Sequence, residues 1–283
     1  MARISSLYLY PIKSCAGWAL DAATLGQAGL ESSGVGDREW MIVTPAGDFL
    51  TQREYPRMAL IRSSIQIHEG RKALVGAAPG MPALGLPLED FALRNPDRHV
   101  KVWNHACDAF DEGDAAAEWL SSFLGARARL VRFDPAHRRL SNRQRTGDVE
   151  AQNRFSDGYP LLTISIASLG KLNERLQEAG RERIPMDRFR PNLVIDDVGP
   201  HDEDRVTELR AAAYTLRAVK PCPRCPIPSI DQETGMRGDD PLDILAQYRG
   251  GPDGVLFGQN MITLKGFGAT ISKGDALEEE WSF

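Results

Sequence analysis

Hydrophobic and polar residues alternate along much of the first third of the chain, a pattern typical of half-buried strands. Ile4–Tyr10 alternates until Pro11 ends it, and Trp40–Val43 leads into the turn residues Thr44–Asp48. Phe49–Thr51 would then return as the second strand of a hairpin. Further short strands are predicted at Ala59–Ile61, Ser64–His68 and Val100–Trp103, and a Gly- and Pro-rich loop at 76–87. The first third is therefore predicted to be an all-β region, closed on itself or packed as a small barrel.

Helical signals appear from residue 114 onward. Asp114 would cap a helix over Ala115–Leu124 that stops at Gly125, and Ser165 would cap a second helix ending near Gly180. A third helix would start at Asp240-Pro-Leu-Asp and reach about Tyr248. Strands are predicted at Val131–Phe133, Leu161–Ile164, Leu193–Ile195, Phe257–Leu264 and Ala269–Ile271, with 135–153 an exposed connection or a mobile lid. The segment Ala211–Val219 leads to the cysteine motif. The predicted fold is mostly β with α (α+β).

Composition narrows the class of protein. A chain of 283 residues should hold about two domains. Its net charge of -5 argues against a general nucleic-acid binder. No signal peptide is visible, and no stretch reaches the ~18 apolar residues of a membrane span. The 4 cysteines make no disulfide framework, so we expect a reducing, cytoplasmic setting in which a close cysteine pair indicates metal or redox chemistry.

The close pair is Cys222-Pro-Arg-Cys225, flanked by prolines. A zinc site would need two more soft ligands at similar spacing, whereas Cys15 and Cys107 each stand alone and the histidines are scattered. The run of cysteines typical of an iron–sulfur cluster is absent. A thioredoxin-like dithiol would begin a helix, which Pro228 would disrupt. Two interpretations stay open: one thiolate binding a metal whose other ligands come from a cofactor, or a proline-stiffened loop with two unremarkable cysteines.

Several motifs in register resemble MOSC-domain proteins that carry an N-terminal MOSC β-barrel domain. The residues are Tyr10-Pro-Ile-Lys-Ser-Cys-Ala-Gly17, Asp37-Arg-Glu-Trp-Met-Ile-Val43, Thr51-Gln-Arg53, Phe155-Ser-Asp157, Arg188-Phe-Arg-Pro-Asn192, Lys220-Pro-Cys-Pro-Arg-Cys225, Phe257-Gly-Gln-Asn260 and Ile271-Ser-Lys-Gly-Asp275. The resemblance extends to the mitochondrial amidoxime reducing component and to bacterial enzymes that detoxify N-hydroxylated bases. It implies an N-terminal β-barrel-like domain over 1–125 and a MOSC β-barrel domain with flanking helices over 126–283.

The resemblance also implies the site. Cys225 would be the catalytic residue and the protein ligand of molybdenum, with the dithiolene sulfurs of the pterin cofactor supplying further ligands, and Cys222 would not bind the metal. The remaining positions would hold the molybdenum–molybdopterin cofactor. Cationic side chains suit its phosphate, and an arginine fork and amides suit its pterin. These positions are Lys13, Ser14, Arg38, Asp157, Arg190, Asn192, Arg224 and Asn260.

Three positions differ from the family pattern or stay ambiguous. Pro226-Ile-Pro228 replaces the hydroxylated residues that commonly follow the ligating cysteine. The tyrosine that relatives often carry near Asn260 is missing. Asp231 could serve as a general acid, but a turn-capping role beside Gln232-Glu-Thr-Gly235 is the stronger interpretation.

The function implied is reduction of small N-hydroxylated substrates, namely N-hydroxylated nucleobases, amidoximes and hydroxylamines. The sequence ends at Phe283 without a ferredoxin-like set of cysteines, so we expect electrons from a separate donor: a flavoprotein reductase, a ferredoxin or a cytochrome b5-like haem protein. One alternative is a sulfur carrier in cofactor maturation, with a persulfide on Cys225. Another is a non-catalytic cofactor-binding module.

Overall fold

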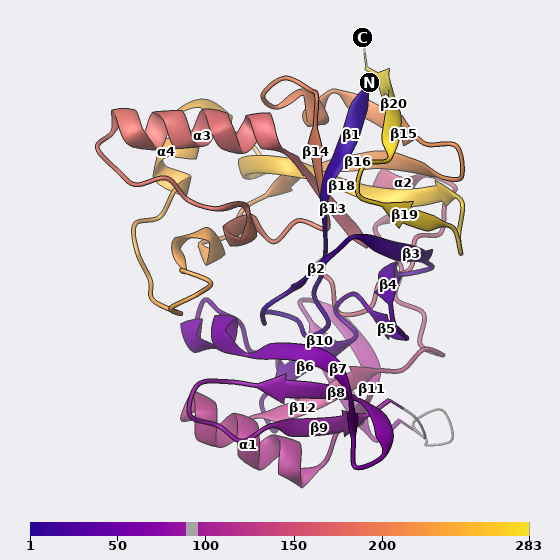
Figure 1. Cartoon of the computed structure of the whole chain (residues 1–283), viewed down its shortest axis with the longest axis vertical. Helices are drawn as coiled ribbons and strands as arrows, with labels where there is room; N and C mark the ends of the chain where they lie inside the picture. The colour runs from indigo at the N-terminus through magenta and orange to yellow at the C-terminus, as the bar shows by residue number, and fades with distance from the viewer. Residues whose placement is uncertain (89–95, 283) are drawn as a thin grey trace.

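The computed structural model describes residues 1–88 and 96–282. Seven of the described strands close into a barrel, because each pairs with the next and the last pairs with the first. In order around the barrel they are β13 (Leu161–Ser165), β14 (Leu193–Asp196), β1 (Ala2–Leu9), β20 (Ala276–Trp281), β15 (Val206–Arg210), β16 (Thr215–Pro223) and β18 (Gly254–Lys265). Both ends of the described chain lie at this end of the molecule (Figure 1). Two short strands extend the sheet: β2 (Trp18–Leu20) beside β1 and β17 (Gly250–Gly251) beside β18.

Three smaller sheets complete the β structure. The one that matters most for the site runs β10 (Arg98–Val102), β11 (His105–Asp111), β12 (Arg129–Phe133), β6 (Trp40–Val43). A second runs β19 (Thr270–Ser272), β3 (Ala22–Gly26), β4 (Gly29–Ser32), β5 (Val35–Gly36), and a third runs β7 (Arg62–His68), β8 (Arg71–Ala77), β9 (Leu84–Pro87). The sheets with β6 to β12 lie at the far end of the molecule from the termini (Figure 1).

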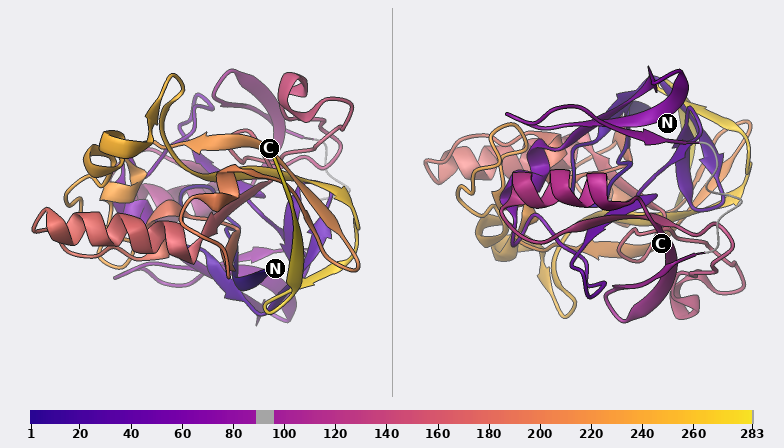
Figure 2. Two further views of the ribbon diagram at one scale, coloured as in Figure 1. Left: turned by 90° about the horizontal axis from the view of Figure 1, so that it is seen from above. Right: turned by 90° about the horizontal axis from the view of Figure 1, so that it is seen from below.

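Helices cover the outside of the sheets. Helix α3 (Ile166–Glu178) connects the parallel strands β13 and β14, and its first turn is capped by Ser165, whose side chain accepts from the Ser168 backbone N–H. Helix α1 (Asp114–Leu124) buries Trp119, Leu120 and Phe123 and ends at Gly125 in the left-handed region. The two helices lie at opposite ends of the long axis (Figure 1), so α3 faces the viewer from above and α1 faces the viewer from below (Figure 2). The others are α2 (Arg143–Thr146), α4 (Leu242–Arg249) and the 3-10 turns Pro56–Leu60, Met186–Phe189, Asp202–Asp204 and Ile227–Ser229.

The predicted fold class, mostly β with α, is confirmed. Several local predictions are wrong, two of them on strands. Ala59 and Leu60 belong to a 3-10 turn, because Pro56 starts a turn that ends before β7. Leu84–Pro87 is a strand and not loop, because it pairs with β8 in spite of its glycine and proline.

The segment 135–153 also differs from the exposed connection or lid that the sequence predicted. Arg139, Ser141 and Asn153 are buried in it. A bridge between Leu140 and Gln152 closes it on itself, so it is a packed loop.

The predicted boundary between residues 125 and 126 stays a prediction. Strands from its two sides pair with each other, since β1 lies between β14 and β20, and β12 lies between β11 and β6.

Candidate functional site

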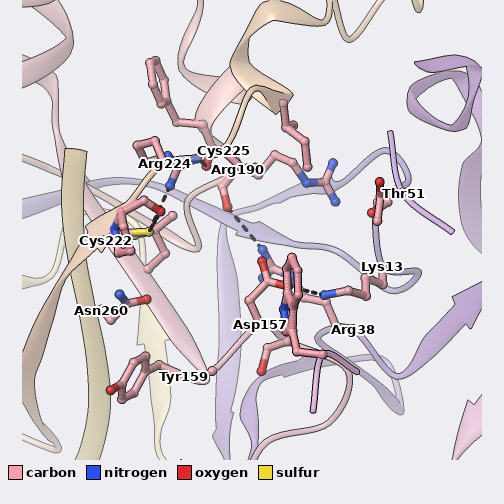
Figure 3. Close-up of a pocket in the computed structure, with 18 of the residues that line it drawn as sticks. Lys13, Arg38, Thr51, Asp157, Tyr159, Arg190, Cys222, Arg224, Cys225 and Asn260 are labelled. Atoms are coloured by element: carbon pink, nitrogen blue, oxygen red, sulfur yellow. Dashed lines mark hydrogen bonds and ion pairs between the residues drawn. The ribbon is translucent and has the colours of Figure 1, made fainter. Parts of the chain in front are cut away.

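One cavity is lined by every residue that the sequence singled out for the site. Its wall comes from loops that lie far apart in the chain: the turn after β1, the loop before β13, the turn before β14, and the loop after β16 (Figure 3). The predicted residues in it are Lys13, Ser14, Arg38, Asp157, Arg190, Asn192, Arg224, Cys225 and Asn260. Their roles toward a ligand stay predictions.

The turn after β1 places Lys13 and Ser14. Pro11 ends the strand, and Cys15 N donates to Ile12 O at 3.1 Å, which closes a turn that holds Ser14 at φ 62°. Lys13 N donates to Trp40 O at 2.8 Å and ties this turn to β6. The turn is therefore anchored on both sides before any ligand binds.

Lys13 and Asp157 form an ion pair at the cavity wall. Lys13 Nζ donates to Asp157 Oδ1 at 2.6 Å and to Phe155 O at 2.9 Å. Burial lowers the pKa of Lys13, although the Asp157 carboxylate opposes this. Desolvation raises the pKa of Asp157 only in part, because its side chain is 72% exposed, and the Lys13 ammonium holds this pKa well below its usual range. Asp157 is therefore a carboxylate at neutral pH.

Arg38 is held by a buried carboxylate and a buried amide. It forms an ion pair with Asp37, which is 1% exposed, and its Nη1 donates to Asn192 Oδ1 at 3.0 Å. Asn192 Nδ2 donates to Asp37 Oδ1 at 3.0 Å and to Tyr8 O at 3.2 Å, and Asn192 Oδ1 also accepts from Leu162 N at 3.2 Å. The side chain of Asn192 is thus used within the protein, where it orients Arg38.

Arg190 is buried in the cavity wall and forms no ion pair with a carboxylate of residues 1–88 or 96–282. It is 8% exposed, its backbone sits at φ 56°, and its guanidinium lies 4.3 Å from the centre of the Tyr10 ring. Among the described residues its Nη2 has no hydrogen-bond partner. Burial lowers the pKa of Arg190. A buried donor without a partner is costly, so it points to a ligand that accepts a hydrogen bond.

The cysteine motif lies where β16 ends. Cys222 is the penultimate residue of β16, and its Sγ accepts from Arg224 Nη1 at 3.2 Å. Arg224 Nη2 donates to Phe189 O at 2.8 Å, and the Arg224 backbone N–H donates to Val255 O at 2.8 Å. Cys225 follows in the loop, half-buried, and its Sγ makes no hydrogen bond to the described residues. The two cysteines thus differ: Cys222 is engaged by Arg224, whereas the thiol of Cys225 is free.

Asn260 is the last residue of the predicted set, and Asp231, the alternative general acid, lies apart from it. Asn260 Nδ2 donates to Lys220 O at 3.1 Å, which links β18 to β16 in the cavity wall. Asp231 lies outside the cavity lining; its Oδ1 accepts from the backbone N–H groups of Glu233 and Thr234, and its Oδ2 binds Arg188. The turn-capping interpretation of Asp231 is therefore correct.

Sequence reasoning missed several residues of the site. Arg139 is 4% exposed and donates to the carbonyls of Arg154, Ser156 and Asp157, so it fixes the loop that carries Asp157. The sequence did not single out Arg139, because it lies in a polar, arginine-rich segment without hydrophobic periodicity. The cavity is also lined by Phe49, Thr51, Arg53, Trp103 and Tyr159.

The charge of the cavity is strongly positive. Lys13, Arg38, Arg53, Arg190 and Arg224 line it, and among the described lining residues Asp157 is the one carboxylate. No cluster of three or more His, Cys, Asp or Glu in the described ranges could hold a metal ion. The arrangement suits a ligand that carries an anionic group and also a centre that one thiol can bind.

Comparison with known proteins identifies the family. Residues 1–127 match the MOSC N-terminal beta barrel domain, and residues 150–278 match the MOSC domain. The chain is 35% identical over 256 residues to mitochondrial amidoxime-reducing component 1 of Mus musculus, covering 88% of this chain and 72% of that protein. It is 33% identical over 253 residues to mitochondrial amidoxime reducing component 2 of Homo sapiens, with 88% and 73% covered.

A second group of relatives is longer. The chain is 30% identical over 258 residues to the molybdenum cofactor sulfurase of Bos taurus, covering 87% of this chain but 29% of that protein. Among residues 1–88 and 96–282, no helix is both long and apolar enough to cross a membrane. The chain belongs to the MOSC-domain family, and its MOSC domain is preceded by a MOSC N-terminal beta barrel domain.

Proposed function

We propose that this chain is a molybdenum-cofactor-dependent oxidoreductase that reduces small N-hydroxylated substrates. The observation that supports this best is the pairing of two unsatisfied groups in one cavity: the free thiol of Cys225 and the buried, unpartnered Nη2 of Arg190. The similarity to amidoxime-reducing components gives the reaction class.

The residues present fit the cofactor. Cys225 offers one soft thiolate ligand for molybdenum, which suits a metal whose further ligands come from the cofactor. Lys13, Arg38 and Arg190 offer cationic donors for a phosphate, and the left-handed Ser14 adds a hydroxyl beside them. Arg224 and Asn260 lie on the Cys225 side of the site (Figure 3).

When bound, the cofactor supplies two-electron redox chemistry, which protein side chains alone lack. The overall reaction takes R–NH–OH, two electrons and two protons to R–NH2 and water. The chain would contribute position and charge: Cys225 would hold the metal, and the arginines would hold the anionic part of the cofactor. Asp157, ionised at neutral pH, fixes the Lys13 ammonium in the cavity wall. We propose that electrons come from a separate flavoprotein reductase, ferredoxin or cytochrome b5-like protein.

Turnover of a simple amidoxime tests the proposal. The protein is purified from a host that makes the cofactor and is supplied with benzamidoxime and a chemical electron donor. We expect benzamidine to form, and we expect Cys225→Ser to abolish it. Protein that carries stoichiometric molybdenum but forms no benzamidine would contradict the proposal and would favour a cofactor-binding module.

The second candidate is a sulfur carrier that uses a Cys225 persulfide. The similarity to molybdenum cofactor sulfurase favours it, together with the half-exposed Cys225 thiol. Mass spectrometry of the protein after incubation with a persulfide donor, which transfers its outer sulfur and leaves as a thiol, decides this: a gain of one sulfur atom on Cys225, in protein free of molybdenum, would support the carrier.

A further inference from the structure

The cavity has an aromatic wall that the chemistry above does not use. Trp103 and Phe49 line it, their ring centres are 5.1 Å apart, and the rings meet edge to face at 67°. The Arg53 guanidinium lies 4.9 Å from the centre of the Trp103 ring. Trp103 Nε1 donates to Asp157 Oδ1 at 3.1 Å, so the indole is tied to the Lys13–Asp157 ion pair. Three different side chains therefore fix the orientation of one ring.

Trp103 also stands where a tryptophan is not expected. It is the first residue of the two-residue loop between β10 and β11, with φ 55°. At that position a positive φ normally selects glycine, since a side chain there strains the backbone. Despite its contacts Trp103 is 46% exposed. A strained, exposed and oriented aromatic side chain on a cavity wall indicates a role in binding rather than in folding.

We propose that Trp103 is a specificity-determining residue that stacks on the planar, conjugated part of an N-hydroxylated substrate. This rests on the proposed function, because it assigns the substrate to the same cavity. The part of the indole that Arg53 and Phe49 leave exposed offers a planar aromatic surface, which favours aromatic amidoximes and N-hydroxylated nucleobases over small aliphatic hydroxylamines and amidoximes. The Nε1–H···Oδ1 bond to Asp157 sets the angle of that surface relative to the Lys13 side of the cavity.

Comparing the binding of two ligands that share the reactive group but differ in aromaticity distinguishes stacking from other effects. Benzamidoxime and acetamidoxime share the amidoxime group, but only the first carries a ring. Trp103→Gly removes the indole while accepting the positive φ, so backbone strain is relieved and the fold is kept. Trp103→Phe keeps an aromatic face without the N–H. Ile67→Ala, at a 73% exposed position of β7 outside the cavity lining, is the matched control.

Calorimetric titration of the cofactor-loaded proteins gives the deciding numbers. We expect Trp103→Gly to weaken benzamidoxime binding roughly 5–150-fold, the effect of removing one stacking aromatic residue. Acetamidoxime binding should change by less than about twofold, and Trp103→Phe should restore most of the benzamidoxime affinity. In turnover the loss should fall on KM, with kcat little changed.

Equal weakening for both ligands, or no change for benzamidoxime, would overturn the proposal. Circular dichroism of each variant confirms that it is folded. If the wild type binds benzamidoxime in a Trp103-dependent manner but never reduces it, the proposed function fails while the assignment of Trp103 stands.

Discussion

Replacing Arg190 with methionine tests whether the cavity holds a cation that the fold itself does not need. In the cofactor-free protein, the buried guanidinium has an unpartnered Nη2. Such a donor costs about 1–3 kcal/mol. The stacking of Arg190 on Tyr10 returns about 1–2 kcal/mol. The two effects nearly cancel, so Arg190→Met should change the free energy of unfolding by less than about 1 kcal/mol.

Arg38→Met is the matched control, because Arg38 lies over the same Tyr10 ring at 4.5 Å. Arg38 differs from Arg190 in that it forms an ion pair with the buried Asp37. Removing one partner of a buried pair costs about 3–5 kcal/mol. Asp37 keeps the hydrogen bonds from Tyr10 N and Asn192 Nδ2, which places the loss at the lower end of that range.

Urea unfolding of the cofactor-free proteins, followed by circular dichroism, measures both variants. Arg190→Met should unfold near the wild-type midpoint, and Arg38→Met well below it. In a host that makes the cofactor, both variants should retain less of it than the wild type. The reasoning is refuted if Arg190→Met destabilises the cofactor-free protein as strongly as Arg38→Met, because Arg190 would then be a structural residue.

Three further predictions concern single polar or titratable side chains, namely Arg139, His201 and Asp157. Arg139→Met should lower cofactor retention, because the carbonyls of the loop that carries Asp157 lose their hydrogen-bond donor. Limited proteolysis should then cut the variant in that loop and leave the wild type intact there. Burial lowers the pKa of His201 to about 4, helped by nearby arginines, so the unfolded chain binds a proton first as pH falls below about 6.5 and stability drops. At pH 5 this amounts to about 2 kcal/mol, and urea midpoints at pH 7 and 5 should show a smaller difference for His201→Phe. The pKa of Asp157 is depressed by Lys13, so its stabilising effect is present above the usual carboxyl pKa of about 3.9 and lost in more acidic solution; Asp157→Asn should flatten the stability profile below pH 4.

Much of the fold follows from local signals in the sequence. The alternation of Ile4–Tyr10 and the Ser165 cap each predict an element that the structure contains, β1 and α3. Pairing between distant segments was not predictable in the same way. Leu84–Pro87 carries the residues of a loop, yet it becomes a strand because β8 offers it a partner. Local composition cannot show which neighbour a segment will find.

For the site, too, the sequence indicated which residues belong together but not the contacts that their side chains make. Motifs in register indicated the residues that line the cavity, although they are far apart in the chain. They did not show that the side-chain atoms of Asn192 are used by Arg38, Asp37 and backbone groups, since that depends on three-dimensional contacts. Trp103 was predicted as the end of a strand, and nothing in its neighbourhood revealed the positive φ or the bond to Asp157.

The central claim is that Cys225, and not Cys222, is the protein ligand of molybdenum. The most direct measurement is the molybdenum content of the wild type, Cys225→Ala and Cys222→Ala, each purified from the same cofactor-producing host. We predict loss of molybdenum in Cys225→Ala alone, because the Cys225 thiol is free in the cavity whereas that of Cys222 accepts a hydrogen bond from Arg224. Equal loss in both variants, or retention in Cys225→Ala, would contradict the claim.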